Sequence, residues 1–258
     1  MIDLEHFLLE FEDKGFYLAE GLIAREHAQE LRDKILQMSA KESAAGQAYI
    51  YPHDPNAKTQ RIWNLTNKHK CFRDLLEIDS LYDALNKIFQ RPTEHPLFFL
   101  SSFQANILYP GACQQKLHID TPFPEPLPPW PARVNSIWLL DSFDSENGAT
   151  EVVPGTHKNA HKPSKEDNAE ITTIPICGSA GSVLITHGNL WHRSGSNTSD
   201  QPRVALLACF AASYMREIAN EEDLSLSVSR EVKDSASPRL RSILGLGHGL
   251  KAGYDFQH

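Results

Sequence analysis

Residues 98–120, FFLSSFQANILYPGACQQKLHID, decide the fold, because the residue pattern changes there from helical to strand-like. The run 98–109 is rich in aromatic and aliphatic residues, and the turn Tyr109-Pro-Gly ends it. Similar runs follow between proline and glycine clusters, at 133–143, 149–153, 170–177, 182–186 and 204–214. Six or more short strands with this punctuation predict a mainly β, double-sheet structure of the jelly-roll kind.

The first ninety residues predict helices instead. Residues 2–12 and 24–40 place apolar residues at helical spacing, and 71–90 predicts two more short helices. A short strand-like piece, 16–19, follows Gly15. The apolar faces of these helices need a packing partner, and the sheet supplied by the second half of the chain is the candidate.

The length of 258 residues fits one domain, since barrels and sandwiches reach this size as single units. We expect a mostly helical N-terminal support over 1–95, a jelly-roll core over 96–214 and a C-terminal extension over 215–258. The high density of prolines in 121–132 excludes a helix or a central strand there. That segment predicts a stiff loop at the rim of a pocket.

Composition excludes several classes of protein. The net charge of −8 and the lack of a Lys/Arg run argue against nucleic-acid binding. No segment reaches the roughly 18 apolar residues of a membrane span, and the acidic N-terminus does not resemble a signal peptide. The cysteines have no zinc spacing and predict free thiols in a reducing cytoplasm. We therefore expect a cytoplasmic protein whose oligomeric state the sequence leaves open.

His118 and Asp120 are the first candidate metal ligands. They lie two residues apart, so on a strand both side chains point to the same face. His192 follows the apolar strand 182–186, where a histidine is well placed to converge on a pocket. Two imidazoles and a carboxylate on one face of an octahedral Fe(II) leave three positions open, which is typical of non-haem iron oxygenases. His187 competes with His192 for this role, and spacing alone does not exclude it.

Arg203 begins the last apolar strand. A guanidinium cannot deprotonate in a protein, so a buried one needs an anionic partner. That partner is either an internal Asp or Glu or the distal carboxylate of a ligand. The position of Arg203, eleven residues after a metal-binding histidine, favours the ligand.

The combined pattern resembles the phytanoyl-CoA dioxygenase (PhyH) family of Fe(II)- and 2-oxoglutarate-dependent oxygenases. The matching motifs occur in the expected order over about residues 100–210. They are the Tyr109-Pro-Gly turn, His118-Ile-Asp120, Asn147-Gly-Ala-Thr, Val153-Pro-Gly-Thr-His157-Lys158, Gly181-Ser-Val-Leu, Trp191-His192-Arg-Ser194-Gly and Arg203.

The resemblance implies a cupin-like double-stranded β-helix that holds Fe(II) through His118, Asp120 and His192. In the family, 2-oxoglutarate chelates the iron, O2 binds beside it, and the co-substrate leaves as succinate and CO2. Halogenating relatives replace the carboxylate with a small residue, so the presence of Asp120 implies hydroxylation or another oxidation.

The resemblance also implies a co-substrate site. The far carboxylate of 2-oxoglutarate would pair with Arg203 and accept a hydrogen bond from Ser194. A tryptophan on the strand after the metal motif lines this site in the family, and Trp138 is the match, although an ordinary core aromatic is an equal alternative. Arg61 is the candidate for a further basic contact.

The substrate is expected to be a small metabolite, in line with secondary metabolism. Phe123 and Trp130 of the proline-rich loop suggest an apolar wall, and Arg133 suggests a contact to an anionic group. Gln104 and Asn106 are polar residues on a strand. They are candidates for supporting groups in the pocket or, equally, for a sheet edge.

Two other functions stay open at this point. A metal-dependent jelly-roll enzyme that does not use 2-oxoglutarate, such as a cofactor-independent dioxygenase or an isomerase, would need the metal ligands but no anchor like Arg203. A non-catalytic jelly roll that binds a ligand would not need a complete set of metal ligands.

Overall fold

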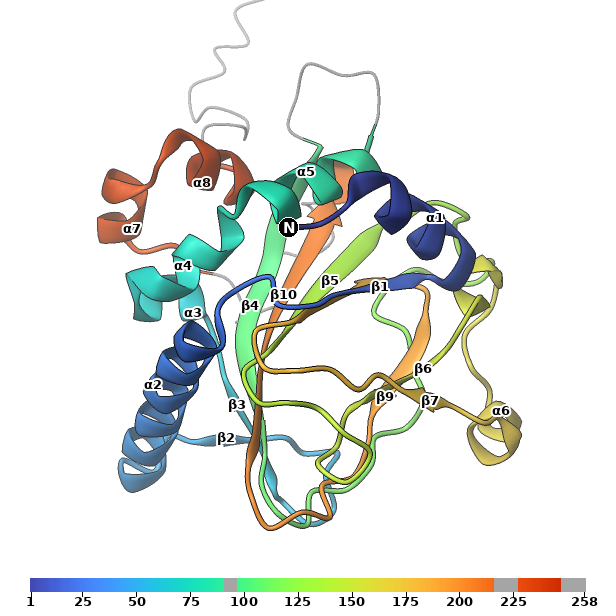
Figure 1. The fold of residues 1–258 in the computed structure, drawn as a ribbon, viewed down its shortest axis with the longest axis horizontal. Helices are drawn as coiled ribbons and strands as arrows, with labels where there is room; N and C mark the ends of the chain where they lie inside the picture. The colour runs from blue at the N-terminus through green and yellow to red at the C-terminus, as the bar shows by residue number, and fades with distance from the viewer. Residues whose placement is uncertain (91–96, 216–226, 247–258) are drawn as a thin grey trace, which may run out of the picture.

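The computed structural model describes residues 1–90, 97–215 and 227–246 of the chain (Figure 1). The helices are α1 (Leu4–Lys14), α2 (Arg25–Ala44), α3 (Leu65–Lys68), α4 (Lys70–Leu76), α5 (Asp79–Ile88), α6 (Lys165–Glu170), α7 (Arg230–Ser235) and α8 (Pro238–Ile243). The strands are β1 (Phe16–Ala19), β2 (Tyr49–Ile50), β3 (Thr59–Ile62), β4 (Phe98–Leu108), β5 (Arg133–Leu139), β6 (Thr150–Val153), β7 (Ile174–Pro175), β8 (Val183–His187), β9 (Trp191–Ser194) and β10 (Arg203–Ala212).

Two antiparallel sheets form the core of the fold. In the described residues, a seven-stranded major sheet has the order β1-β8-β5-β10-β4-β3-β2, and a three-stranded minor sheet has the order β7-β6-β9. Figure 1 shows the minor sheet on one side of the major sheet and most helices on the other. This arrangement confirms the predicted jelly-roll fold with flanking helices.

The two faces of the major sheet bury different clusters. Side chains alternate between faces along a strand. On β5, Val134 and Trp138 join the large cluster formed with the helices, whereas Ile137 and Leu139 join the cluster between the two sheets. The cavity described below therefore takes its wall from the Ile137 face of β5.

Local signals explain how α1 leads into β1. Asp3 caps the helix by accepting hydrogen bonds from the backbone nitrogens of Glu5 and His6. Gly15 ends the helix with a φ of 84°, a conformation that glycine adopts without strain. A Cβ at this position would lie 2.5 Å from Nδ1 of His157, so the close contact also requires glycine.

Several predicted boundaries differ from the structure. The predicted strand 170–177 is reduced to Ile174–Pro175, because a capping box between Ser164 and Asp167 starts α6, which extends to Glu170. Strands β2, β3 and β9 were not predicted. Strands β1 and β3 come from the N-terminal part and pair within the major sheet, so the predicted helical support also contributes strands. The single-domain division stays a prediction.

The loop 121–132 contains no helix or strand, as predicted.

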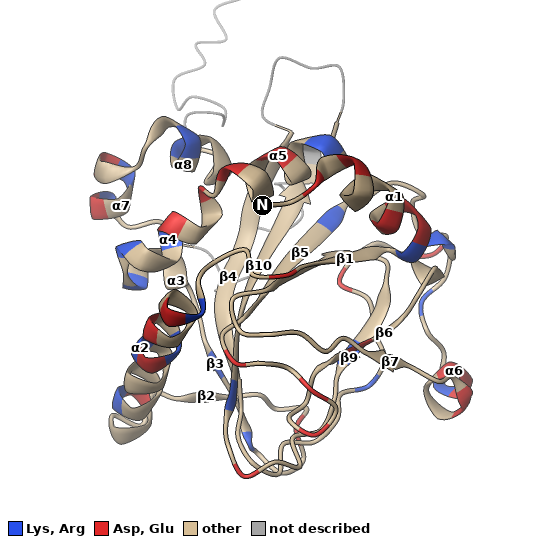
Figure 2. Cartoon of the chain, viewed as in Figure 1, with Lys and Arg blue, Asp and Glu red and all other residues tan. Residues whose placement is uncertain are grey.

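In the C-terminal extension, residues 227–246 contain α7 and α8, and α8 contacts α4 and β4. The remainder of the extension, from 216 to 226 and from 247 onward, lies outside the described residues. Acidic and basic residues alternate along α2 (Figure 2). Within the described ranges, no helix is both long enough and apolar enough to cross a bilayer.

Candidate metal centre

The backbone brings His118, Asp120 and His192 together at the edge of the minor sheet. His192 lies in β9, and His118 pairs with it through two backbone hydrogen bonds, each of 3.0 Å. The backbone nitrogen of Asp120 donates to the carbonyl of Gly188 at 2.9 Å. The ligand atoms of the three residues all lie within 4.8 Å of one another. No other group of three or more His, Cys, Asp or Glu residues in the described part of the chain has this arrangement.

Both imidazoles present Nε2 to the centre. Nδ1 of His118 lies 2.8 Å from the carbonyl of Lys116, and Nδ1 of His192 lies 2.9 Å from the carbonyl of Leu190. Since a carbonyl oxygen can only accept, Nδ1 must carry the hydrogen in each ring. With Nδ1 as the donor, each ring offers Nε2 to a metal ion in its neutral form. His192, whose Nε2 hydrogen-bonds Asp120, would release that proton when a metal binds.

The distances between ligand atoms are close to those of a metal site. Nε2 of His192 lies 3.2 Å from Oδ2 of Asp120, and Nε2 of His118 lies 4.0 Å from Oδ1. Atoms bound at right angles to one transition-metal ion, each about 2.1 Å from it, are about 3 Å apart. A small inward movement of His118 would therefore complete the site.

Electrostatics also suit a cation. Burial alone would raise the pKa of Asp120, but the charge and hydrogen bond of His192, together with His118 and Asn135, bring that pKa well below its usual range. Burial lowers the pKa of His118, which keeps this imidazole neutral near pH 7. An ionised carboxylate and a neutral imidazole are the forms that bind a metal.

A cavity of about 140 Å³ opens beside these ligands. It contains five residues that the sequence suggested for the co-substrate or substrate: Arg61, Gln104, Asn106, Ser194 and Arg203. Its other lining residues, which sequence reasoning missed, are Gln115, Ile137, Thr150, Arg193 and Leu207. Gln115 lies three residues before His118 and Thr150 closes the Asn147-Gly-Ala-Thr motif, so proximity to these motifs was the available signal.

Arg203 is a buried charge without an ion pair. Its side chain donates from Nη2 to the carbonyl of Gly148 and, at 2.9 Å, to Oγ of Ser194. The guanidinium lies 4.4 Å from the ring centroid of Phe143. Burial lowers its pKa to about 10, so it is still charged at pH 7. No carboxylate of the described chain forms an ion pair with it, and its Nε has no partner there.

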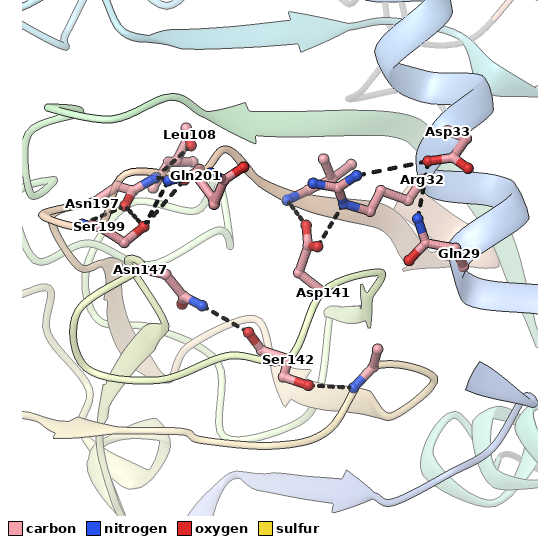
Figure 3. Close-up of polar contacts among 12 residues, drawn as sticks. Gln29, Arg32, Asp33, Leu108, Asp141, Ser142, Asn147, Asn197, Ser199 and Gln201 are labelled. Atoms are coloured by element: carbon pink, nitrogen blue, oxygen red, sulfur yellow. Dashed lines mark hydrogen bonds and ion pairs between the residues drawn. The ribbon is translucent and has the colours of Figure 1, made fainter. Parts of the chain in front are cut away.

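Asp141 is the acidic residue whose charge acts on Arg203, but both of its carboxylate oxygens already accept hydrogen bonds from other groups. Oδ1 accepts from Nε of Arg32 at 2.6 Å (Figure 3). Oδ2 accepts from the backbone nitrogen of Val204 at 2.8 Å. Arg203 therefore lines the cavity without an ion-pair partner among the described residues. Of the two partners that the sequence left open, this arrangement favours the carboxylate of a ligand over an internal salt bridge.

Other polar atoms in the cavity wall also lack partners. Nε of Arg61, Oε1 of Gln104 and Oδ1 of Asn106 are buried and have no hydrogen bond within the described residues. The guanidinium of Arg61 stacks on the ring of Tyr51 at 3.9 Å. Buried polar atoms are normally satisfied, so these three atoms are candidate contacts for a polar ligand in the cavity.

The structure does not bring four predicted residues to the cavity. Trp138 is fully buried on the opposite face of β5, where its Nε1 donates to Oγ of Ser136 at 3.2 Å. This position fits the alternative of a core aromatic, because Ile137 and not Trp138 lines the cavity. Phe123 packs against the large core cluster, and Trp130 is 45% exposed. Arg133 donates to the carbonyl of Asp120 at 3.3 Å and does not line the cavity.

His187 lies apart from the metal ligands. It is 4% exposed, and its ring centroid is 5.2 Å from that of His157. Its Nδ1 accepts a hydrogen bond from the backbone nitrogen of Asn189 at 3.0 Å. The geometry thus selects His192 as the third candidate ligand.

The sequence matches the profile of one protein family and is similar to proteins of fungi and bacteria. The profile of one family, described as phytanoyl-CoA dioxygenase (PhyH), matches residues 11–205. The dioxygenase af480 of Aspergillus fumigatus is 29% identical over 252 residues, which cover 96% of this chain and 78% of that protein.

Solved structures share the fold. The epimerase SnoN, in complex with Fe3+, alpha ketoglutarate and nogalamycin RO, has a TM-score of 0.66 at 13% identity, and the match covers 87% of this chain and 92% of SnoN. HygX from Streptomyces hygroscopicus, with nickel, 2-oxoglutarate and hygromycin B bound, has a TM-score of 0.64 at 15% identity, and the match covers 81% of this chain and 87% of HygX.

Proposed function

The chain belongs to the phytanoyl-CoA dioxygenase (PhyH) family, and from that premise we propose that it is an Fe(II)- and 2-oxoglutarate-dependent dioxygenase that oxidises a C–H bond of a small metabolite. One observation carries the proposal. The candidate ligands His118, Asp120 and His192 share a cavity with Arg203, whose buried charge has no carboxylate partner in the described chain. A metal site alone would not need this anion-binding group.

The residues of the cavity would have two roles, metal binding and co-substrate binding. His118, Asp120 and His192 would hold Fe(II) on one face, leaving the remaining positions for 2-oxoglutarate and O2. The bound ion would couple the decarboxylation of 2-oxoglutarate, to succinate and CO2, with oxidation of the substrate.

Arg203 and Ser194 would bind the distal carboxylate of 2-oxoglutarate. The hydroxyl of Ser194 accepts from Arg203, so its own hydrogen is free to point toward a ligand. Arg61, from β3, would add a second positive charge to the cavity. These residues would orient the co-substrate and exclude water from one end of the site.

The proposed substrate is a small molecule of secondary metabolism. SnoN and HygX are described with nogalamycin RO and hygromycin B, which are small molecules. SnoN is described as an epimerase, so proteins with this fold do not all carry out the same reaction. The carboxylate of Asp120 supports hydroxylation or another oxidation over halide transfer.

Succinate formation tests the proposal. Purified protein with Fe(II), 2-oxoglutarate, O2 and a panel of metabolites should form succinate, and His118→Ala should abolish this. His6→Ala, which replaces an exposed histidine on α1, is the matched control and should retain activity. If the wild type neither binds 2-oxoglutarate nor forms succinate, a metal-dependent enzyme without this co-substrate replaces the proposal.

A further inference from the structure

Asp120 lies on a segment with little regular structure. The only β pairing of residues 109–132 is the bridge at His118, so no continuous ladder sets the direction of the Asp120 side chain. A carboxylate on such a segment can rotate unless a neighbour holds it. The orientation of this metal ligand therefore depends on contacts from outside the segment.

Strand β5 provides these contacts from two residues on the same face. Arg133 donates from Nη1 to the backbone carbonyl of Asp120 at 3.3 Å. Asn135, two residues on, donates from Nδ2 to Oδ2 of Asp120 at 2.5 Å. Asn135 is only 6% exposed. The backbone and the carboxylate of Asp120 are thus both held by one strand.

This strand is a rigid support. It lies between β8 and β10, and Asn135 is in register with Thr186 on one side and Cys209 on the other. A central strand paired on both sides moves less than an edge strand or a loop, because its backbone hydrogen bonds are complete.

Close packing at Gly188 brings the metal segment within reach of β5. The nitrogen of Gly188 donates to the carbonyl of Arg133 at 2.8 Å, and its carbonyl accepts from the nitrogens of Asp120 and Thr121. A Cβ on Gly188 would lie 2.8 Å from Cβ and from the carbonyl oxygen of Arg133. The short distance between Asn135 and Asp120 is therefore built into the backbone.

We propose that Asn135 is a positioning residue of the metal centre: its side-chain amide holds the carboxylate of Asp120 turned toward the two imidazoles, so that the three ligands are arranged before the ion binds. The inference rests on the proposed function, because it assumes that these residues bind a metal. An amide suits the role because it donates a hydrogen bond without adding a charge that would compete with the ion. Partners of this kind commonly change metal affinity by about 10- to 100-fold.

The experiment measures metal affinity rather than turnover. Ni(II), which does not oxidise in air, is titrated calorimetrically into the apo forms of the wild type, Asn135→Leu and Asn135→Ser. Leucine matches the size of asparagine but has no donor, and the serine hydroxyl is too short to reach Asp120. Both variants should bind Ni(II) about 10- to 100-fold more weakly. If leucine prevents folding, the serine variant decides the result.

Ser136→Ala is the matched control. Ser136 is the next residue of β5, is fully buried and faces away from Asp120, where it accepts from Trp138. Its replacement should lower the thermal midpoint to a similar extent as the Asn135 variants but leave Ni(II) affinity unchanged. Unchanged Ni(II) affinity in a folded Asn135 variant would overturn the inference.

A separate titration with 2-oxoglutarate distinguishes this inference from the proposed function. If the wild type binds Ni(II) but not 2-oxoglutarate, the proposed function fails, while the Ni(II) titrations still decide the role of Asn135. If the wild type binds no Ni(II), both fail.

Discussion

Replacing Arg203 with methionine should weaken 2-oxoglutarate binding strongly. Methionine keeps much of the length of the side chain but removes the charge and every donor. Nε of Arg203 has no partner in the described chain, and the guanidinium faces the cavity that contains the metal ligands. Two charge-assisted hydrogen bonds to the distal carboxylate, at about 1.5 kcal/mol each, amount to about 3 kcal/mol. Since about 1.4 kcal/mol corresponds to a tenfold change, Kd should rise about 100-fold.

The assay is a calorimetric titration of 2-oxoglutarate into protein preloaded with Ni(II). Arg193→Met is the matched comparison, because Arg193 also lines the cavity but its Nε is paired with Glu151 at 2.7 Å. Its replacement should change Kd much less. Metal affinity should be the same in Arg203→Met and the wild type, since Arg203 is not a ligand. A folded Arg203→Met protein that binds 2-oxoglutarate as tightly as the wild type would refute the reasoning.

Three further predictions concern affinity, packing and pH. Ser194→Ala removes one hydrogen bond to the co-substrate and should raise the Kd for 2-oxoglutarate about fivefold, in the same titration. Gly188→Ala places a Cβ 2.7 Å from Oγ1 of Thr121 and should lower the free energy of unfolding by about 1–3 kcal/mol in urea titrations; no loss would show that the turn can move. Burial, with a smaller effect of His157, lowers the pKa of His187 from an ordinary 6.5 to about 3 in the folded protein. Between these two pH values only the unfolded state gains a proton on His187, so the free energy of unfolding falls as the pH falls. The loss at pH 5 should be about 2 kcal/mol, and His187→Gln should flatten this part of the stability profile measured by urea unfolding.

Strands with strong patterning were predictable, and short polar ones were not. β4 and β10 carry long runs of apolar and aromatic residues, so both were found within a few residues of their ends. β3, with the sequence TQRI, has no such run and forms because its backbone pairs with β4. In 170–177, the local capping of α6 prevailed over a weak strand preference.

The sequence by itself determined the residue types of the candidate metal centre and their order along the chain. His118 and Asp120 at a spacing of two, followed by His192 and Arg203, limit the chemistry because few other side chains bind a metal and an anionic co-substrate. The tertiary structure alone decided which face of β5 meets the cavity. Ile137 lines it and Trp138 does not, because the larger ring packs on the helix side of the major sheet.

Tertiary structure also decided the partner of each charge. Arg32 of α2 binds Asp141 across 109 positions of sequence and thereby leaves Arg203 without a carboxylate in the described chain. In the same way, Asn135 contacts Asp120 only because Gly188 lets two segments approach closely. Electrostatic and hydrogen-bond partners depend on distances in space, which residue spacing along a chain does not specify.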